Sequence, residues 1–307
     1  MLKTMTVTNF LGESVVINLR DNEPEHGLII KEIDGLGPPH AVINMSDYAT
    51  DDGSKWNSSR AEKRTIIMTF LLTMVPDIET ARENTYKYFP LKKEVHLFFE
   101  TDERTCEITG RVESNQPAIF VQDATETITI VCEEPWLYRV SDLEPQVTNF
   151  SVTEPAFEFP FSNESLDFPL IEFGRYVIHK ERVLVYEGDT SVGMTMVIQC
   201  ITPGVGDITV YNQTVDATMV IHTGKIQSVT GSVFNTGDQI IISTVDRTRS
   251  AKLLRNGIYT NILNIIERTS DWFELEKGDN VFLFSTSTGN DDYITFSIEN
   301  RTVYEGI

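Results

Sequence analysis

Three pairs of neighbouring carboxylates are the first residues in this sequence that could do chemistry. They are Asp51/Asp52, Glu133/Glu134 and Asp291/Asp292. A glycoside hydrolase needs two carboxyl groups about 5–9 Å apart on either side of a sugar ring. Neighbouring side chains of a strand point to opposite faces of the sheet, and neighbouring side chains of a loop usually face water. We therefore interpret the three pairs as surface charge.

Other catalytic and ligand-binding patterns are incomplete. The five histidines lie far apart, and none has the HExxH spacing or the close cysteine partner that a zinc site uses. A calcium loop built around Gly53 would have Tyr48 and Thr50 where carboxylates belong. No glycine pair completes a dinucleotide or phosphate loop, and no GxSxG is present. We expect a protein that is not an enzyme and that has no catalytic residue, cofactor or metal.

The three tryptophans could stack on sugar rings, because an exposed indole offers a flat apolar face with a polar edge. Trp136 follows a proline at the end of a predicted strand, and Trp272 precedes a predicted tight turn, so packing is the favoured interpretation for both. Trp56 lies in a polar segment, where we expect it to be exposed and to contact another protein. Trp272 is the candidate if the chain binds carbohydrate.

The 307 residues carry 25 Lys and Arg against 46 Asp and Glu, a formal net charge of −21. Affinity for nucleic acid or for an anionic membrane depends on cationic side chains, so this charge opposes both. We expect no sequence-specific nucleic-acid binding and no membrane insertion. At about 100–200 residues per domain, the length suggests two domains. The amino terminus has no apolar run behind its lysine, so we expect no signal peptide and a chain that is cytosolic when made.

Most of the chain alternates apolar and polar residues, which is typical of half-buried strands and predicts a mainly β protein. The predicted strands are 14–19, 64–72, 94–100, 104–113 and 125–132 in the first half, and 206–211, 239–245, 280–285 and 293–299 in the second. Ile128, Ile130 and Cys132 should share one buried face. Three cysteines are too few for a disulfide scaffold, so we interpret Cys106 and Cys132 as small core residues.

One helix is predicted near 77–89. Asp77 places a negative charge at its amino-terminal end, where the helix dipole favours one. Ala81, Thr85 and Phe89 recur at helical spacing, so we expect this face to pack on a sheet.

Two polar segments divide the chain. Residues 33–62 are rich in Gly, Pro, Asp and Ser, and we expect them to be irregular in part, as a long functional loop. Residues 141–169 are rich in proline and acidic residues, and proline interrupts strand pairing. We place the domain boundary at the start of this Pro-rich entry segment, which gives domains 1–140 and 141–307.

Several short motifs follow one another along nearly the whole chain. In the first half they are IDGLGPP at 33–39, the basic run RAEKR at 60–64, and CEEPWLY at 132–138. In the second half they are FEFPF at 157–161, GDQI at 237–240, LEKGDN at 275–280 and YEGI at 304–307. In this order they resemble the distal tail (Dit) proteins of siphophages and related tail-like particles.

The resemblance implies a mainly β fold, with an N-terminal β-sandwich-like domain that carries one α-helix and forms a hexameric ring. A C-terminal galectin-like β-sandwich, or jelly roll, is implied to follow it. The implied role is a structural virion protein, the hub at the tail tip or baseplate, assembled in the host cytoplasm and leaving a channel for DNA. The implied partners are the tail tube protein, a tail-tip hub protein of the tail-associated lysin type, and a receptor-binding protein.

For the interfaces of such a ring, the candidates are Trp56, Arg60, Lys63 and Arg64. We expect carboxylates to line the channel or the outer rim, because like charges would keep DNA from sticking. The alternative is a host cell-surface carbohydrate-binding module formed by the C-terminal sandwich. A tail-associated hydrolase is a further alternative, and the sequence has no catalytic signature for it.

Overall fold

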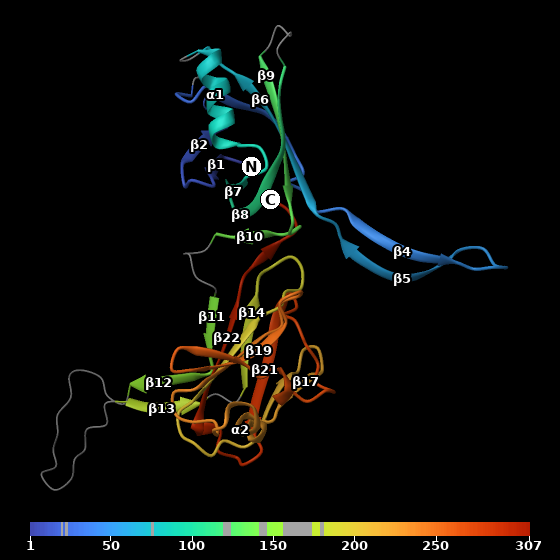
Figure 1. Ribbon diagram of the computed structural model, residues 1–307. Coiled ribbons are helices and arrows are strands. Elements are labelled where there is room, and N and C mark those ends of the chain that lie inside the picture. Colours follow the sequence, from blue (N-terminus) through green and yellow to red (C-terminus); the bar gives the residue numbers. More distant parts are fainter. Residues whose placement is uncertain are drawn as a thin grey trace, which may run out of the picture. The chain divides into compact units, whose positions relative to one another are not determined.

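The computed structural model of the protein describes residues 1–19, 21, 24–74, 77–118, 124–140, 146–155, 174–178 and 181–307 (Figure 1). The chain forms two compact units, each with its own hydrophobic core. Unit 1 comprises Met1–Leu143 and Val303–Ile307, and unit 2 comprises Glu144–Thr302.

Unit 1 is built on one large antiparallel sheet. Its strands lie in the order β2-β1-β7-β8-β9-β6-β3, with β10 paired to β8 and β23 paired to β10. Their bounds are β1 Thr4–Asn9, β2 Ser14–Asn18, β3 Leu28–Asp34, β6 Arg64–Leu72, β7 Glu94–Glu100, β8 Thr105–Pro117, β9 Thr125–Cys132, β10 Leu137–Arg139 and β23 Val303–Tyr304. The strands predicted in the first half are all present, with small differences at their ends.

Alternate residues of these strands form the core of unit 1. In β9, Ile128, Ile130 and Cys132 are completely buried, as the period-two pattern predicts. Cys106, Cys132 and Cys200 are free and buried, which confirms the prediction that Cys106 and Cys132 are core residues. Burial raises the pKa of each thiol to about 11, so all three are protonated at neutral pH and react slowly.

Helix α1 (Ile78–Tyr88) lies within the predicted range. Asp77 is its N-cap, and its carboxylate accepts a hydrogen bond of 2.8 Å from the backbone N–H of Thr80. Ala81 and Phe89 are completely buried, and the ring of Phe89 lies 5.6 Å from that of Phe70 on β6. The helix therefore packs on the sheet, as its apolar face predicts.

The structure of residues 33–62 is more regular than we expected. Strands β4 (Ala41–Asp47) and β5 (Ser54–Ala61) form an antiparallel hairpin, which we call the arm, and it projects from the sheet of unit 1 (Figure 1). The turn-forming residues are concentrated before β4 and in the turn, where Gly53 has a φ of 104°. Between them, β4 alternates apolar and polar residues, and this alternation is what forms the strand.

Unit 2 is a β-sandwich. One sheet has the order β11-β22-β15-β18-β19-β20 and the other the order β14-β21-β16-β17. The bounds are β11 Gln146–Asn149, β14 Glu181–Tyr186, β15 Thr195–Cys200, β16 Ile208–Asn212, β17 Ala217–Ile221, β18 Gln239–Ser243, β19 Ser250–Arg255, β20 Ile258–Asn261, β21 Gly278–Thr286 and β22 Ile294–Asn300. Phe296 of β22 and Phe284 of β21 have ring centroids 5.4 Å apart, so the two inner faces share one core.

Short elements complete unit 2. They are the paired strands β12 Ser151–Pro155 and β13 Gly174–Ile178, the helix α2 Ile226–Thr230, and the 3₁₀ turns η1 Thr223–Lys225, η2 Leu263–Ile265 and η3 Asp291–Tyr293. Most of the Pro-rich entry segment 141–169, including the motif FEFPF, lies outside the described residues. The mainly β fold, with one helix in the first half and a sandwich in the second, is confirmed.

The last five residues belong to unit 1, although we expected them in the second domain. The reason is strand pairing. Leu137 and Tyr138 of β10 pair with Tyr304 and Val303 of β23. Buried Val303 and Tyr304 thereby join unit 1, and the Ile307 N–H donates to the Leu36 carbonyl at 3.3 Å.

Candidate interaction surface

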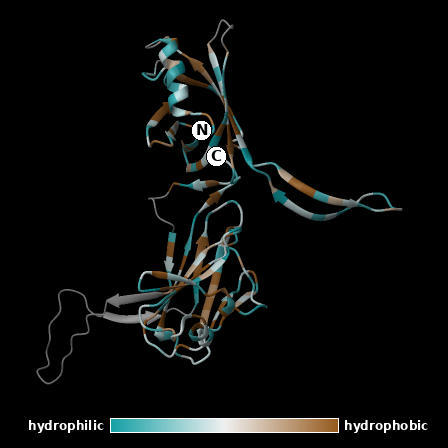
Figure 2. Ribbon diagram, viewed as in Figure 1, coloured by the Kyte–Doolittle hydropathy of each residue, from teal (hydrophilic) through white to brown (hydrophobic). Residues whose placement is uncertain are grey.

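The arm has one apolar face that no described residue covers. Met45 lies opposite Trp56 in the hairpin, and Ile43 precedes Met45 on the same face of β4. These three side chains are 58%, 59% and 56% exposed, in that order. Figure 2 shows the apolar residues as a brown segment along β4. The exposure expected for Trp56 is confirmed, and the structure adds two apolar neighbours that the sequence did not single out.

The other face of the arm is polar and hydrogen-bonded within the arm. The Asn44 side-chain amide donates to the Ser58 hydroxyl at 3.0 Å, and that of Asn57 donates to the Ser46 hydroxyl at 2.5 Å. Asn57 is the extra residue where the register shifts, and it stands between Trp56 and Ser58. The arm is therefore amphipathic, and its polar face needs no partner protein to satisfy these groups.

Arg64 fixes the base of the arm. It is only 3% exposed, and its guanidinium donates four hydrogen bonds of 2.6–2.7 Å to backbone carbonyls. The acceptors are Gly35, Gly37, Pro135 and Glu305. Through these bonds Arg64 links three segments of unit 1. Gly35 and Gly37 precede the arm, Pro135 lies near the end of the first part of unit 1, and Glu305 is one of the carboxyl-terminal residues.

Arg64 therefore has a role inside the chain in place of the interface role that its charge suggested. Burial lowers the pKa of Arg64. The four carbonyl oxygens accept hydrogen bonds from its charged guanidinium and thereby stabilise it. Gly35 lets the chain approach closely here, because a Cβ at this position would lie 2.1 Å from the Thr65 carbonyl oxygen. Arg60 and Lys63 are exposed at the same end of the arm, so their charges remain available to a partner.

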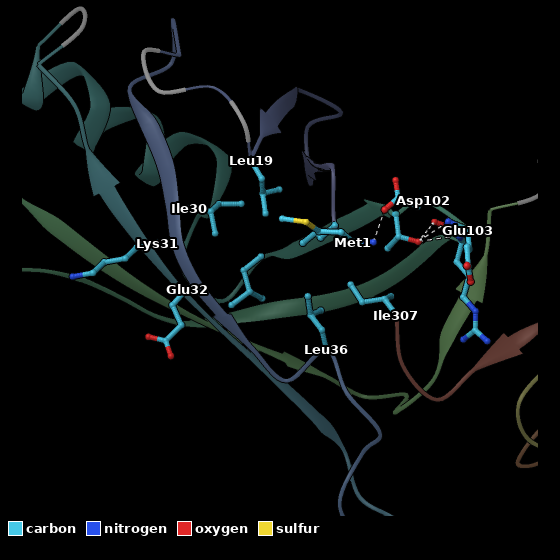
Figure 3. Close-up of a pocket in the computed structure, with 13 residues that line it drawn as sticks. Met1, Leu19, Ile30, Lys31, Glu32, Leu36, Asp102, Glu103 and Ile307 are labelled. Atoms are coloured by element: carbon cyan, nitrogen blue, oxygen red, sulfur yellow. Dashed lines mark hydrogen bonds and ion pairs between the residues drawn. The ribbon is translucent and has the colours of Figure 1, made fainter.

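A pocket of about 770 Å³ lies in unit 1 at the base of the arm (Figure 3). Six aliphatic side chains form its apolar part: Leu2, Leu19, Ile30, Ile33, Leu36 and Ile307. Leu19 and Ile30 lie on one side of it, and Leu36 and Ile307 lie side by side on the other. Its polar lining residues include Lys31, Glu32, Asp102, Glu103 and Arg104.

The polar lining is partly fixed by ion pairs. The amino group of Met1 lies 2.7 Å from the Asp102 carboxylate, and the Lys3 ammonium lies 3.2 Å from it. Their hydrogen bonds lower the pKa of Asp102. The Arg104 guanidinium lies 4.4 Å from the centroid of the Tyr304 ring. The lining of the pocket is therefore mixed, with aliphatic and charged side chains together.

The other predicted candidates lie elsewhere. Trp272 is partly buried and packs against the core of unit 2, in agreement with the packing interpretation. Glu133 and Glu134 are exposed, as are Asp51 and Asp52, in agreement with surface charge. Asp291 is an exception, because it is 4% exposed and accepts hydrogen bonds from the backbone N–H and the hydroxyl of Thr286. It holds a turn, which explains its burial.

Sequence reasoning missed one cluster of charged residues in unit 2. His222 lies between two carboxylates: its Nδ1 is 2.8 Å from Asp207 and its Nε2 is 2.6 Å from Glu267. The hydrogen bonds to Asp207 and then to Glu267 raise the pKa of His222. The three residues are 15 and 45 positions apart, so only the fold brings them together.

This cluster predicts a pH dependence of stability. Because the pKa of His222 is higher in the folded chain, its stabilising contribution is complete below the ordinary histidine pKa of about 6.5. That contribution is lost as the pH rises through the folded-state pKa. We expect the denaturant midpoint of unit 2, followed by alkylation of Cys200, to fall over this range. In His222→Gln the fall should disappear, and an unchanged profile would contradict the assignment.

In the described part of the chain, no group of three or more His, Cys, Asp or Glu side chains is arranged to hold a metal ion. Among the described residues, no helix has the length and apolar character to span a membrane.

The chain is similar in structure to the Dit protein (gp 19.1) of phage SPP1, described as a paradigm of the hub adsorption apparatus in phages that infect Gram-positive bacteria. The alignment covers 97% of this chain and 99% of that chain, with a TM-score of 0.54 and 14% identity. The likeness shows that both chains share a fold over nearly their whole length.

Two more distant matches come from the phage P2 baseplate in its activated conformation, one with Ca and one with Sr. Both have a TM-score of 0.41 at 10% identity; the first covers 98% of each chain and the second 97% of each. No family model matches the sequence, and no curated protein matches it.

Proposed function

We propose that this protein, which has the fold of a phage distal tail protein, is a structural hub at the tip of a phage tail. In this proposal six copies form a ring through unit 1 at the end of the tail tube, and unit 2 binds tail-tip components. The observation that carries the proposal is the fold shared with SPP1 Dit, which includes both units of this chain.

The arm supports the proposal that unit 1 forms the ring. Ile43, Met45 and Trp56 give each copy an apolar surface that its own described residues leave exposed. An interface that joins two different patches of the same chain closes into a ring when the rotation between copies permits it. The exposed cations Arg60 and Lys63, at the base of the arm, would lie near this interface.

The net charge of −21 supports a channel through which DNA passes. Six copies multiply this charge, and like charges repel the phosphate backbone. We propose that carboxylates line the channel or the outer rim of the ring. The proposed partners are the tail tube protein, a tail-tip hub protein of the tail-associated lysin type, and a receptor-binding protein. The protein would be assembled in the host cytoplasm and reside in the virion; such a hub binds proteins and needs no catalysis.

The oligomeric state tests this proposal. At micromolar concentration, we expect native mass spectrometry of the full chain to give a six-chain species, and negative-stain images to show a ring with a central hole. Mixing with tail tube protein should give a larger complex that contains both. A chain that stays monomeric at all concentrations and does not bind the tube would contradict the proposal. A ring with a positively charged lumen would contradict only the role given to the acidic residues.

A further inference from the structure

We infer that a basic and apolar surface at one end of unit 1 binds an acidic, partly apolar surface of the tail tube protein. The inference rests on the proposed function, because a ring at the end of the tube brings the two proteins together. The surface is formed by the β1–β2 turn, the end of α1 and the turn before β7, and we call it the lysine surface. Its residues are Phe10, Leu11, Lys87, Leu91, Lys92 and Lys93.

Asn9 fixes the β1–β2 turn beside the end of α1. It is only 2% exposed, and its Oδ1 accepts hydrogen bonds of 3.0 Å from the backbone N–H groups of Leu11 and Glu13. Its side-chain amide donates a hydrogen bond of 3.0 Å to the Lys87 carbonyl. The Lys87 ammonium also lies 3.0 Å from the Glu13 carboxylate. The turn therefore presents its side chains next to the last turn of the helix.

The turn between α1 and β7 is fixed in the same region. The Lys92 backbone N–H donates to the Val112 carbonyl at 2.9 Å, and the Val112 N–H donates to the Lys93 carbonyl at 3.2 Å, so this turn is tied to β8. The Lys93 ammonium lies 5.1 Å from the centroid of the Phe10 ring, which brings the two turns together. Segments far apart in the sequence thus form one continuous surface.

Three large apolar side chains of the lysine surface face water. Phe10 and Leu91 are each about half exposed, and Leu11 is 68% exposed. Exposed apolar groups with charged groups around them mark sites of protein interaction, because covering them removes apolar area from water. The neighbouring lysines supply the charged groups, as in the polar rim of a protein interface.

The charge of this surface is opposite to that of the chain. Residues 84–93 contain three lysines and no Asp or Glu, in a chain with a net charge of −21. Lys87 is paired with Glu13, whereas no carboxylate among the described residues forms an ion pair with Lys92 or Lys93. Complementary charges steer a partner to its site and select against wrong partners. The two lysines therefore favour a protein surface that carries acidic side chains.

The backbone of Lys92 adds an independent observation. Its φ is 65°, in the left-handed region, where glycine is favoured and a side chain is strained. Residues held in such a conformation are concentrated at functional sites. A binding role for the ammonium explains why lysine stands where glycine would suit the backbone better.

The position of the lysine surface favours the tube over the tail-tip components that we assign to unit 2. The lysine surface directly precedes β7. At the other end of β7, Glu100 pairs with Thr105, whose carbonyl accepts a hydrogen bond of 3.0 Å from the Val140 N–H. Strand β23 returns to unit 1 at that end, through its pairing with β10. The seven residues of β7 separate the two ends by about 20 Å, so a protein on the lysine surface binds away from both connections to unit 2.

Co-sedimentation of the full chain with preformed tubes of tail tube protein tests the inference. We expect Leu11→Ser to raise the concentration for half-saturation about tenfold and Lys92→Gly to raise it about threefold. Ile258→Ser and Arg247→Gly are matched controls in unit 2. Ile258 is also 68% exposed, and Arg247 is an exposed cation with a φ of 64°. Both controls should bind like the unchanged protein.

Lys92→Gly also separates binding from folding. Because glycine suits the backbone at this position, the denaturant midpoints for alkylation of Cys106 and Cys132 should stay the same or rise while tube binding weakens. If Lys92 acts only in the fold of its turn, the midpoints should fall and tube binding should stay the same. That result would contradict the inference.

Native mass spectrometry of each variant without tubes separates this inference from the proposed function. A six-chain species with weakened tube binding supports the inference. Unchanged tube binding by both variants overturns it and leaves the hub intact. Weakened ring assembly shows that the lysine surface contacts a second copy, and a loss of binding only to the tail-tip hub protein shows a different partner; either result overturns the inference. An unchanged protein that forms no ring and binds no tube overturns both.

Discussion

Replacing Arg64 with methionine should lower the free energy of unfolding of unit 1 by about 3 kcal/mol or more. The substitution removes four hydrogen bonds and leaves the carbonyls of Gly35, Gly37, Pro135 and Glu305 without their donor. A buried carbonyl that loses its partner retains the full cost of leaving water. The free energy of unfolding of Arg64→Lys should lie between those of the unchanged protein and of Arg64→Met, because an ammonium keeps the charge but cannot reproduce the planar fork of donors.

The buried cysteines allow this effect to be measured separately in each unit. Cys106 and Cys132 belong to the core of unit 1, and Cys200 belongs to the core of unit 2. Pulsed alkylation along a denaturant series, read by mass spectrometry, should show the first two thiols exposed at lower denaturant in Arg64→Met. Cys200 should be unchanged. Arg60→Met is the matched control, since Arg60 is exposed; equal midpoints in the two variants would show that Arg64 does not hold unit 1 together.

Replacing Met45 and Trp56 together with serine should raise the concentration for half-assembly of the proposed ring at least thirtyfold. The two residues are paired in the hairpin, so their side chains lie next to each other on one face of the arm. They are 58% and 59% exposed in the single chain. Truncating an interface hot spot costs about 2 kcal/mol or more, which is about thirtyfold in a dissociation constant. Because both are exposed, the substitutions should leave the folding of the single chain nearly unchanged.

Mass photometry over a dilution series measures this shift, and circular dichroism checks the fold. Tyr259→Ser is the control, because Tyr259 is an aromatic residue of similar exposure, 62%, in unit 2. It should assemble like the unchanged protein. A double variant that forms rings at the same concentration as this control would show that the arm face is not part of the ring interface.

Local patterns in the sequence predicted most of the secondary structure. The ranges of β6, β7 and β9 agree with the predicted 64–72, 94–100 and 125–132, because strict alternation of buried and exposed residues marks a half-buried strand. Helix α1 was predicted for a similar reason, since its cap and its buried face both depend on residues three to four positions apart.

The arm shows a strand signal that we did not use. Its segment is rich in turn-forming residues, and we expected residues 33–62 to be irregular in part, which holds for the chain before β4 and for the turn between β4 and β5. The alternation of Ile43 and Met45 with Asn44 and Ser46, followed by Asp52-Gly53, was a usable hairpin signal. The composition of the whole segment hides this alternation, because turn-forming residues flank β4 at both of its ends.

The fold class, the helix of the first half, the buried thiols and the acidic charge could be predicted from the amino-acid sequence, because each depends on neighbouring residues or on composition. The roles of individual polar residues became visible only in the folded chain. The sequence predicts an interface cation at Arg64, yet the fold brings four carbonyls to its guanidinium, one of them 241 positions away in the chain. His222 gains two carboxylates, and Asp291 becomes buried, in the same way. The physical reason is that hydrogen bonding and desolvation depend on which distant segments meet, and no local pattern encodes those contacts.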